Sequence, residues 1–419
     1  MQGTQVAVEH ELNHLHLFDG YGIELEYMIV DTEQLDILPV ADKVLYTIAG
    51  SYESEIELGE LRWSNELVLH VIELKTNGPA RELTSLSSLF NHDIQHINAI
   101  LLPYGAQLMP TGLHPWMNPH TQTVLWPHEY NAIYETYNSI FGCQGHGWSN
   151  IQSNHINLPF YDDAEFARLH SAIRLVLPLL PALAASTPII DGRMNSVLDS
   201  RLKVYCNNQA KIPSIAGNII PEGVLSRREY ERVILKKMYQ DIAPYDPEGI
   251  IQHEWLNSRG AIARFERNTI ELRVIDMQEC PLADLSVAFL TTEIVKALVK
   301  ERWTDHAHQC SFAAEPLVTI FNKTVHEAEQ ALIDNRFYLE MFSYPSSAPC
   351  KAEDLLKYLA ETLIPDSSFW THPIAKLLSQ GCLARRIIKA LKGDTRLEHI
   401  REVYGELCKC LARGKFFSV

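Results

Sequence analysis

The segment Tyr21–Asp31 reads Tyr-Gly-Ile-Glu-Leu-Glu-Tyr-Met-Ile-Val-Asp and decides the fold. Its apolar residues recur at period two, which predicts a strand with an apolar back and a polar front. Glu24 and Glu26 share the front, about 6.5–7 Å apart. Two carboxylates this close repel each other unless water, a cation or an arginine lies between them. A solvated sheet face is the ordinary explanation, so a metal role requires matching ligands from other strands.

A second strand is expected over Asn65–Thr76, after a helical or irregular stretch that ends near Arg62. It carries Glu66 and Glu73, which are seven residues apart and would face opposite sides of a regular strand. Both can face one site only if Glu66 lies in the entering loop or a bulge turns it.

Two further segments alternate in the same way. In residues 150–159, Ser153, His155 and Asn157 share one face, and in residues 268–276 Glu271 and Arg273 share one face. Arg264 and Glu266 lie upstream with the same parity as Glu271. An exposed cross-strand salt-bridge face is the alternative explanation for this last group.

The remaining pattern is mainly helical. Apolar spacing predicts helices over 79–102, with Pro79 in the first turn, and over 127–141 and 163–185. Beyond Pro281 the chain is expected to be helical to Leu411, with breaks near Pro316, Pro345, Pro365 and Pro373.

The polar faces of the four strands carry compatible ligands. Glu24, Glu26, Glu73, His155 and Glu271 would meet on one curved antiparallel sheet, and carboxylates with one imidazole suit Mg²⁺ or Mn²⁺ better than zinc. So many carboxylates need more than one divalent ion, and several ions with arginines are what phosphoryl transfer requires. The sequence has no Walker motif, which argues against a P-loop kinase.

Five motifs in this order, GIELEYMIVD, ELVLHVIELKT, GLHP, SNHINL and NTIELRVID, resemble glutamate–cysteine ligase family 2 of the carboxylate–amine ligases. The resemblance spans residues 18–281 and implies the α+β fold of the glutamine synthetase-like superfamily. That fold is a curved antiparallel sheet cradle flanked by helices, which here precedes a mostly helical C-terminal third. It also implies ATP and two or three Mg²⁺ ions, with Mn²⁺ as an alternative.

By the same resemblance, each site residue has an expected role. Metal ligands would be Glu24, Glu26, Glu66, Glu73, His155 and Glu271, with His155 and Asn157 also binding the cofactor. Arg273 would face the transferred phosphoryl group, and Arg201 and Arg264 would bind substrate or phosphate. The implied reaction activates a carboxylate, the γ-carboxylate of glutamate, as an acyl phosphate that an amine or amino acid then displaces.

The chain departs from the family at the strand Asn154–Leu158, which replaces a His-Val-His-Val-Gly type sequence, and at Asp191–Asn195. The first strand also lacks a further acidic residue. The acceptor therefore need not be cysteine. A relative that binds nucleotide or amino acid without turnover is one alternative. Another is a zinc hydrolase using His10-Glu11-Leu12-Asn13-His14, an H-E-x-x-H match in a polar lead-in.

Bulk composition limits the partners and the location. With 36 basic and 52 acidic residues, the formal charge of −16 disfavours nucleic acid and anionic membranes. The most apolar run, residues 175–190, is too short for a membrane span and contains three prolines. Eight scattered cysteines and no secretory signal predict a cytoplasmic protein with reduced thiols. Small-molecule substrates are the expected partners, and a homodimer is left open.

The length of 419 residues and the hydrophobic content of 46% allow one large core. We expect a polar lead-in over residues 1–17 and a single catalytic domain over 18–419. Within it, residues 18–285 would form the sheet cradle with its helices, and 286–419 the helical part packed on it.

Overall fold

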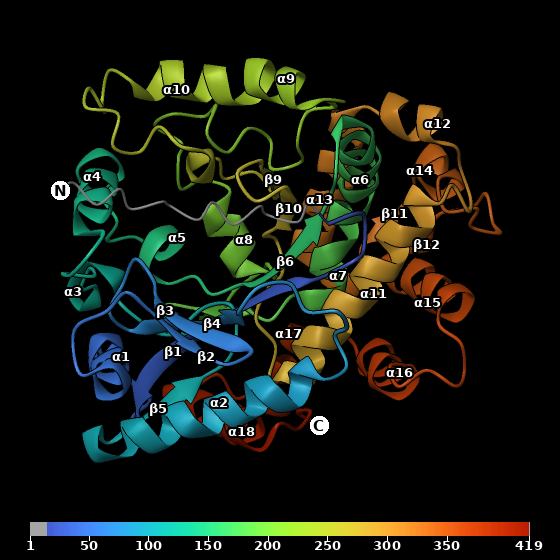
Figure 1. Cartoon of the computed structure of the whole chain (residues 1–419). Helices are drawn as coiled ribbons and strands as arrows, with labels where there is room; N and C mark the ends of the chain where they lie inside the picture. The colour runs from blue at the N-terminus through green and yellow to red at the C-terminus, as the bar shows by residue number, and fades with distance from the viewer. Residues whose placement is uncertain (1–14, 419) are drawn as a thin grey trace.

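An antiparallel sheet of eight strands organises the computed structural model, which describes residues 15–418 (Figure 1). The strand order is β2-β3-β4-β1-β6-β10-β9, and β5 also pairs with β1. The strands are β1 (Gly22–Asp31), β2 (Glu55–Leu58), β3 (Leu61–Asn65), β4 (Val71–Thr76), β5 (Ala106–Met109), β6 (Asn154–Pro159), β9 (Ala261–Arg264) and β10 (Thr269–Leu272). The predicted antiparallel cradle is confirmed.

The helices that cover the sheet come from every part of the chain. The longer ones are α1 (Ala41–Ala49), α2 (Leu86–Leu101), α4 (Asn131–Phe141), α6 (Asp163–Val176), α11 (Pro281–Val299), α13 (Ala314–Glu327), α15 (Ala352–Leu363), α16 (Thr371–Gln380), α17 (Leu383–Leu391) and α18 (Leu397–Arg413). The shorter ones are α3 (Pro119–Gln122), α5 (His146–Ser149), α7 (Leu180–Ala184), α8 (Ser200–Tyr205), α9 (Arg227–Tyr230), α10 (Lys236–Ile242), α12 (His306–Ser311) and α14 (Arg336–Glu340).

The apolar back of β1 lies in the main core. Ile23, Leu25, Tyr27 and Ile29 are fully buried and pack in one cluster with apolar residues of α2, α6 and α11. Helix α2 packs on this apolar back, whereas α18 packs with Met28 and Val30 on the opposite face of β1. Residues of α4, α5 and α8 border the polar front beside Glu26 and His155. The run from Asp163 to Ala184 is long and apolar enough to cross a membrane, but 94% of its most apolar 18-residue window is buried inside the protein. It is therefore a core helix, interrupted at Leu177–Leu179 by a short 3₁₀ turn.

The register of the sheet determines which polar residues meet. Glu24 of β1 lies opposite His155 on one side and Lys75 on the other, and Glu26 lies opposite Glu73. Glu271 of β10 lies opposite Asn157 of β6. Because directly opposed side chains on one face lie about 4.5–5.5 Å apart at Cβ, this register gathers the acidic residues at the centre of the front face.

The second predicted strand was wrong in its boundaries. Residues 65–76 hold the end of β3, a connection through Glu66, and β4, and the preceding stretch holds α1 and β2. The turn was missed because the segment between the two strands contains no glycine or proline and carries leucine and valine. Leu67 to Leu69 reach other parts of the molecule, since Leu69 N donates to Val124 O and Trp126 N donates to Leu67 O.

Some predicted helix boundaries were also wrong, whereas others were confirmed. Helix α2 begins at Leu86, because Tyr21 and Ala80 exchange two backbone hydrogen bonds that hold the chain after Pro79 beside the sheet. The predicted breaks near Pro316 and Pro373 are confirmed, since α12 ends at Ser311 and α15 ends at Leu363. Each proline lies in the first turn of the next helix, α13 or α16, where its missing backbone N–H costs no hydrogen bond. Two small sheets also interrupt the helical pattern, β7 (Ile189–Ile190) with β8 (Arg193–Met194) and β11 (Leu332–Ile333) with β12 (Cys350–Lys351).

Candidate active site

The polar front of the sheet is buried. Glu26, Glu73, His155 and Glu271 are each less than one-tenth exposed, although all four are ionisable. A solvated sheet face would leave such side chains in water, so that explanation of the Glu24/Glu26 pattern is wrong, as is the exposed salt-bridge face proposed for Glu271. Buried ionisable groups require partners, and the front face supplies them.

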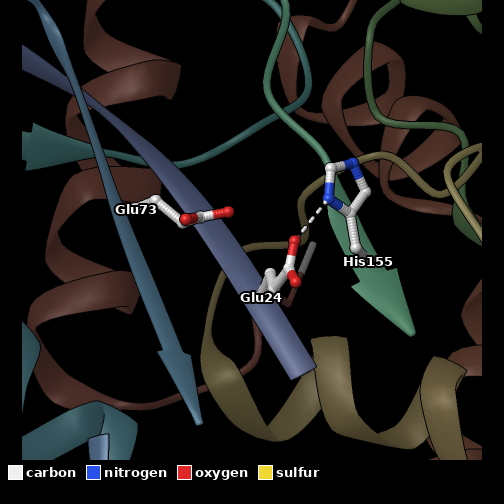
Figure 2. A group of neighbouring side chains, drawn as sticks. All are labelled: Glu24, Glu73 and His155. Atoms are coloured by element: carbon white, nitrogen blue, oxygen red, sulfur yellow. Dashed lines mark hydrogen bonds and ion pairs between the residues drawn. The ribbon is translucent and has the colours of Figure 1, made fainter. Parts of the chain in front are cut away.

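His155 lies at the centre of the acidic residues. Its Nδ1 is 3.0 Å from Glu24 Oε2 (Figure 2). The same Nδ1 is 3.9 Å from Glu271 Oε1, and Nε2 is 3.8 Å from Glu26 Oε1. Ser153 Oγ lies 2.8 Å from Nε2, and Asn157 Nδ2 donates to Glu24 Oε1 at 3.0 Å. One imidazole is thus within 4 Å of three carboxylates that come from two different strands.

The charges around His155 shift several pKa values. Burial alone would lower the pKa of His155, but the contact with Glu24 and the charges of Glu26 and Glu271 raise it to about 9. Burial opposes ionisation of Glu24 as well, yet the His155 contact leaves the pKa of Glu24 below its ordinary value. The pKa of Glu271 is also lowered despite burial, because Arg273, His155 and Arg264 face it.

Glu66 lies in the connection before β4 and joins the cluster from there. The sequence required this position if Glu66 and Glu73, seven residues apart, were to face one site. Carboxylate oxygens of Glu26, Glu66 and Glu73 lie within 4.8 Å of one another, and ligand atoms of Glu24, Glu73 and His155 form a second such group. Figure 2 shows Glu73 and His155 on either side of Glu24. Glu73 belongs to both groups, so the two candidate metal positions are adjacent.

These residues fit divalent cations chemically. Burial, together with the neighbouring carboxylates, raises the pKa of Glu66 well above its ordinary value and raises the pKa of Glu26. Both therefore resist ionisation unless positive charge is supplied. Hard oxygen donors with one imidazole are the donor set that Mg²⁺ and Mn²⁺ accept.

Two arginines flank the acidic cluster on the β9–β10 side. Arg264 Nη1 donates to Glu271 Oε2 at 3.1 Å, and Arg273 Nε forms an ion pair with Glu271 Oε1 at 3.2 Å. Arg273 Nη1 also donates to Asn257 O at 3.4 Å. Arg273 lines a cavity of about 180 Å³ that Glu26, Glu66 and His155 border as well. Its position allows it to contact a ligand there, whereas Arg264 reaches the site through Glu271.

Arg201 borders the same cavity but is tightly held. It is 1% exposed, its Nε donates to Asp276 Oδ1 at 2.7 Å, and its Nη2 donates to the carbonyl of Arg273 at 3.1 Å. Asp276 in turn accepts from Ser186 N and from Thr187 Oγ1. Arg201 therefore borders the cavity and is anchored to the protein interior through Asp276.

We expect Asp276→Asn to lower the free energy of unfolding by about 3–5 kcal/mol, because it leaves the buried Arg201 guanidinium without a counter-charge. Chemical denaturation of the variant and the parent protein measures this difference. A loss below about 1 kcal/mol would mean that Arg201 does not depend on Asp276.

Three further polar residues contact the acidic cluster, and two of them, Lys75 and Ser64, were not singled out from the sequence. Lys75 Nζ lies 3.0 Å from Glu73 Oε2, Ser64 Oγ donates to the same oxygen at 2.6 Å, and Ser153 N donates to Glu26 Oε2 at 2.7 Å. The parity of Lys75 with Glu73 could have indicated the first. Ser64 gave no signal because its strand was not expected.

The His10–His14 motif lies outside the residues that the structure describes, so its zinc-site prediction has no structural test. The described part of the chain places its candidate cation ligands on the sheet.

Comparison with known proteins gives a family and several relatives. The family described as Glutamate-cysteine ligase family 2 matches residues 21–400. A protein of Archaeoglobus fulgidus is 29% identical over 396 residues, covering 94% of this chain and 99% of its own length. A Nocardioides protein provisionally named glutamate–cysteine ligase 2-1 is 24% identical over 301 residues, covering 71% of this chain and 72% of its own.

A solved structure shares the fold. Glutamate–cysteine ligase from Francisella tularensis, in complex with AMP, superposes with a TM-score of 0.54 at 11% identity, covering 93% of this chain and 88% of that chain.

Proposed function

Since this chain belongs to glutamate–cysteine ligase family 2 and is a carboxylate–amine ligase, we propose that it uses ATP to activate the γ-carboxylate of glutamate and joins it to an amine. The observation that carries the proposal is the convergence of Glu24, Glu26, Glu66, Glu73, His155 and Glu271 beside Arg273. The AMP complex of the structural relative supports a nucleotide as the cofactor.

The acidic cluster would hold the metal ions. Glu24, Glu73 and His155 would bind one Mg²⁺, and Glu26, Glu66 and Glu73 a second, with Mn²⁺ as an alternative. When bound, such ions neutralise phosphate oxygens during in-line phosphoryl transfer. Asn157 would orient Glu24, to which its amide donates. Each of these roles is part of the proposal.

The arginines would handle the transferred group. Arg273 borders the cavity, and its planar guanidinium can pair with a phosphoryl or acyl phosphate oxygen while still contacting Glu271. Arg264 would hold Glu271 in place from the other side, through the 3.1 Å hydrogen bond. Arg201 would fix the main chain of Arg273 and present its own charge to substrate.

The proposed metal site should titrate in a defined direction. Glu26 and Glu66 have raised pKa values and the pKa of His155 is about 9, so protons occupy part of the site in the metal-free protein. Binding of Mg²⁺ must displace those protons, so its affinity should rise with pH from near the ordinary glutamate pKa up to about 9. Calorimetric titration of Mg²⁺ at several pH values, in buffers that differ in ionisation enthalpy, gives both affinity and proton release. An affinity that does not change with pH would contradict this metal site.

Hydroxylamine provides the direct test of the activation step, because it attacks acyl phosphates and gives hydroxamates. We expect Mg²⁺, ATP, glutamate and hydroxylamine to yield γ-glutamyl hydroxamate and ADP in equal amounts. Binding of ATP without ADP release from glutamate and any amine would instead favour the non-catalytic alternative.

Residues 18–419 would act as one catalytic unit. One apolar cluster includes residues from Ile23 of the first strand to Leu411 of the last helix, which supports a helical C-terminal third that folds together with the sheet.

A further inference from the structure

Five aromatic side chains border the cavity beside the acidic cluster. Tyr205 is one of them, and we call the other four the aromatic wall: Tyr134, Tyr137, Trp148 and Trp255. The Tyr137 ring centroid lies 5.2 Å from that of Trp148 and 6.0 Å from that of Trp255. All four side chains are partly exposed and border the cavity, so they offer aromatic surface to a ligand there. Such surface inside a concave site favours an apolar ligand group.

The charged residues that border this cavity belong to the acidic cluster and its arginines. These residues are Glu26, Glu66, His155, Arg201 and Arg273, and the other residues that border the cavity are aromatic, aliphatic or neutral polar side chains. A ligand that placed a charged tail against the aromatic wall would lose hydration there, and the rings themselves offer no counter-charge. The wall therefore disfavours acidic and basic side chains.

Gln209 supplies an unused hydrogen-bond acceptor in the same cavity. It is 3% exposed and its Nε2 donates to Ser258 Oγ at 2.8 Å, but its Oε1 accepts nothing from the residues that the structure describes. A buried carbonyl oxygen without a donor is rare in folded proteins. An N–H of a bound ligand would satisfy it.

From these observations we propose that the amine substrate of this ligase carries an uncharged, apolar side chain, aromatic or branched, which packs on the aromatic wall while its nitrogen donates to Gln209. This deepens the proposed function and rests on it. The cavity volume of about 180 Å³ equals roughly six waters at ~30 Å³ each, which suits a small amine.

The aromatic wall also suits the chemistry of the amine. An amine attacks only as its neutral form, and an apolar surrounding disfavours the ammonium form. The nitrogen lone pair then forms the C–N bond to the acyl carbon, and the C–O bond to phosphate breaks with its electron pair. Phosphate leaves, and the proton lost by nitrogen passes to phosphate or water.

The test is steady-state ADP release with Mg²⁺, ATP and glutamate across a panel of acceptors. The panel contains 2-phenylethylamine and 3-methylbutylamine, phenylalanine and leucine, cysteine, putrescine and lysine, and hydroxylamine. We expect kcat/KM for the apolar acceptors to exceed that for putrescine, lysine and cysteine by about 10- to 100-fold. Comparison of each simple amine with its amino acid shows whether the acceptor also needs a carboxylate.

Variants of the wall separate contact with the acceptor from general damage. Trp148→Ala and Trp255→Ala should each lower the ratio of kcat/KM for 2-phenylethylamine over hydroxylamine by about tenfold or more. Trp148→Phe keeps an aromatic ring and should retain much of the parent ratio. Phe337→Ala is the matched control, because Phe337 is 71% exposed on α14, away from α5 in Figure 1, and should leave both rates unchanged.

A preference for cysteine, or for an acceptor with a charged side chain such as lysine or putrescine, would overturn the inference. So would wall variants that leave the ratio of kcat/KM for 2-phenylethylamine over hydroxylamine unchanged. In each of these outcomes the protein still forms hydroxamate from glutamate and hydroxylamine. Absence of hydroxamate with every acceptor overturns the ligase proposal itself, so the two failures are distinguishable.

Discussion

Glu271→Gln is expected to lower amine-dependent ADP release by about 10²- to 10³-fold while the protein stays folded. Glu271 is 4% exposed, and its two oxygens contact Arg264 and Arg273 at 3.1 and 3.2 Å. Glutamine keeps the shape but removes the charge and turns one oxygen into an N–H donor that faces an arginine. The variant would therefore lose a proposed metal ligand and leave Arg273 without the anion that orients it.

The measurement is kcat/KM for ADP release together with the far-UV circular dichroism spectrum and the unfolding midpoint. Glu57→Gln is the matched control, since Glu57 lies on β2 of the same sheet with a side chain that is 66% exposed. We expect the control to keep the parent rate. Near-normal turnover in folded Glu271→Gln would remove Glu271 from the site, and the same result in Glu24→Ala would end the metal-cradle proposal.

Arg273→Lys is expected to lower the same rate by about 10²-fold or more, although the charge is conserved. The Arg273 guanidinium reaches Glu271 through Nε and Asn257 O through Nη1, and it borders the cavity at the same time. A lysine ammonium is a point charge on a flexible stem and cannot make these contacts together. The Arg273 side chain is partly buried, which limits how far the shorter lysine can rearrange.

The split between kinetic constants identifies the role of Arg273. If it contacts the transferred group, kcat should fall much more than KM for ATP rises. Arg336→Lys, an exposed arginine paired with Glu340 on α14, is the matched control and should be neutral. A variant with unchanged kcat and a raised KM for ATP would make Arg273 a ground-state binding residue only.

The candidate site could largely be anticipated because its ligands follow local rules. Glu24 and Glu26 on one strand, and Glu271 with Arg273 on another, share faces through the period-two geometry of the strands, which neighbouring residues in the chain specify. Arg201 shows the limit of such reasoning. Its sequence position suggested a substrate arginine, but its ion pair with Asp276, 75 residues away, is a product of the fold.

By itself the sequence determined the antiparallel cradle and the polarity of each strand face, since alternation is local and a shift of one residue would expose the core. Tertiary structure alone decided the turn between β3 and β4, the start of α2, and the gathering of Tyr134, Tyr137, Trp148 and Trp255 around one cavity. It also decided that the polar front is buried. These features depend on contacts between segments far apart in the chain, and their free energy is present only once those segments have packed together.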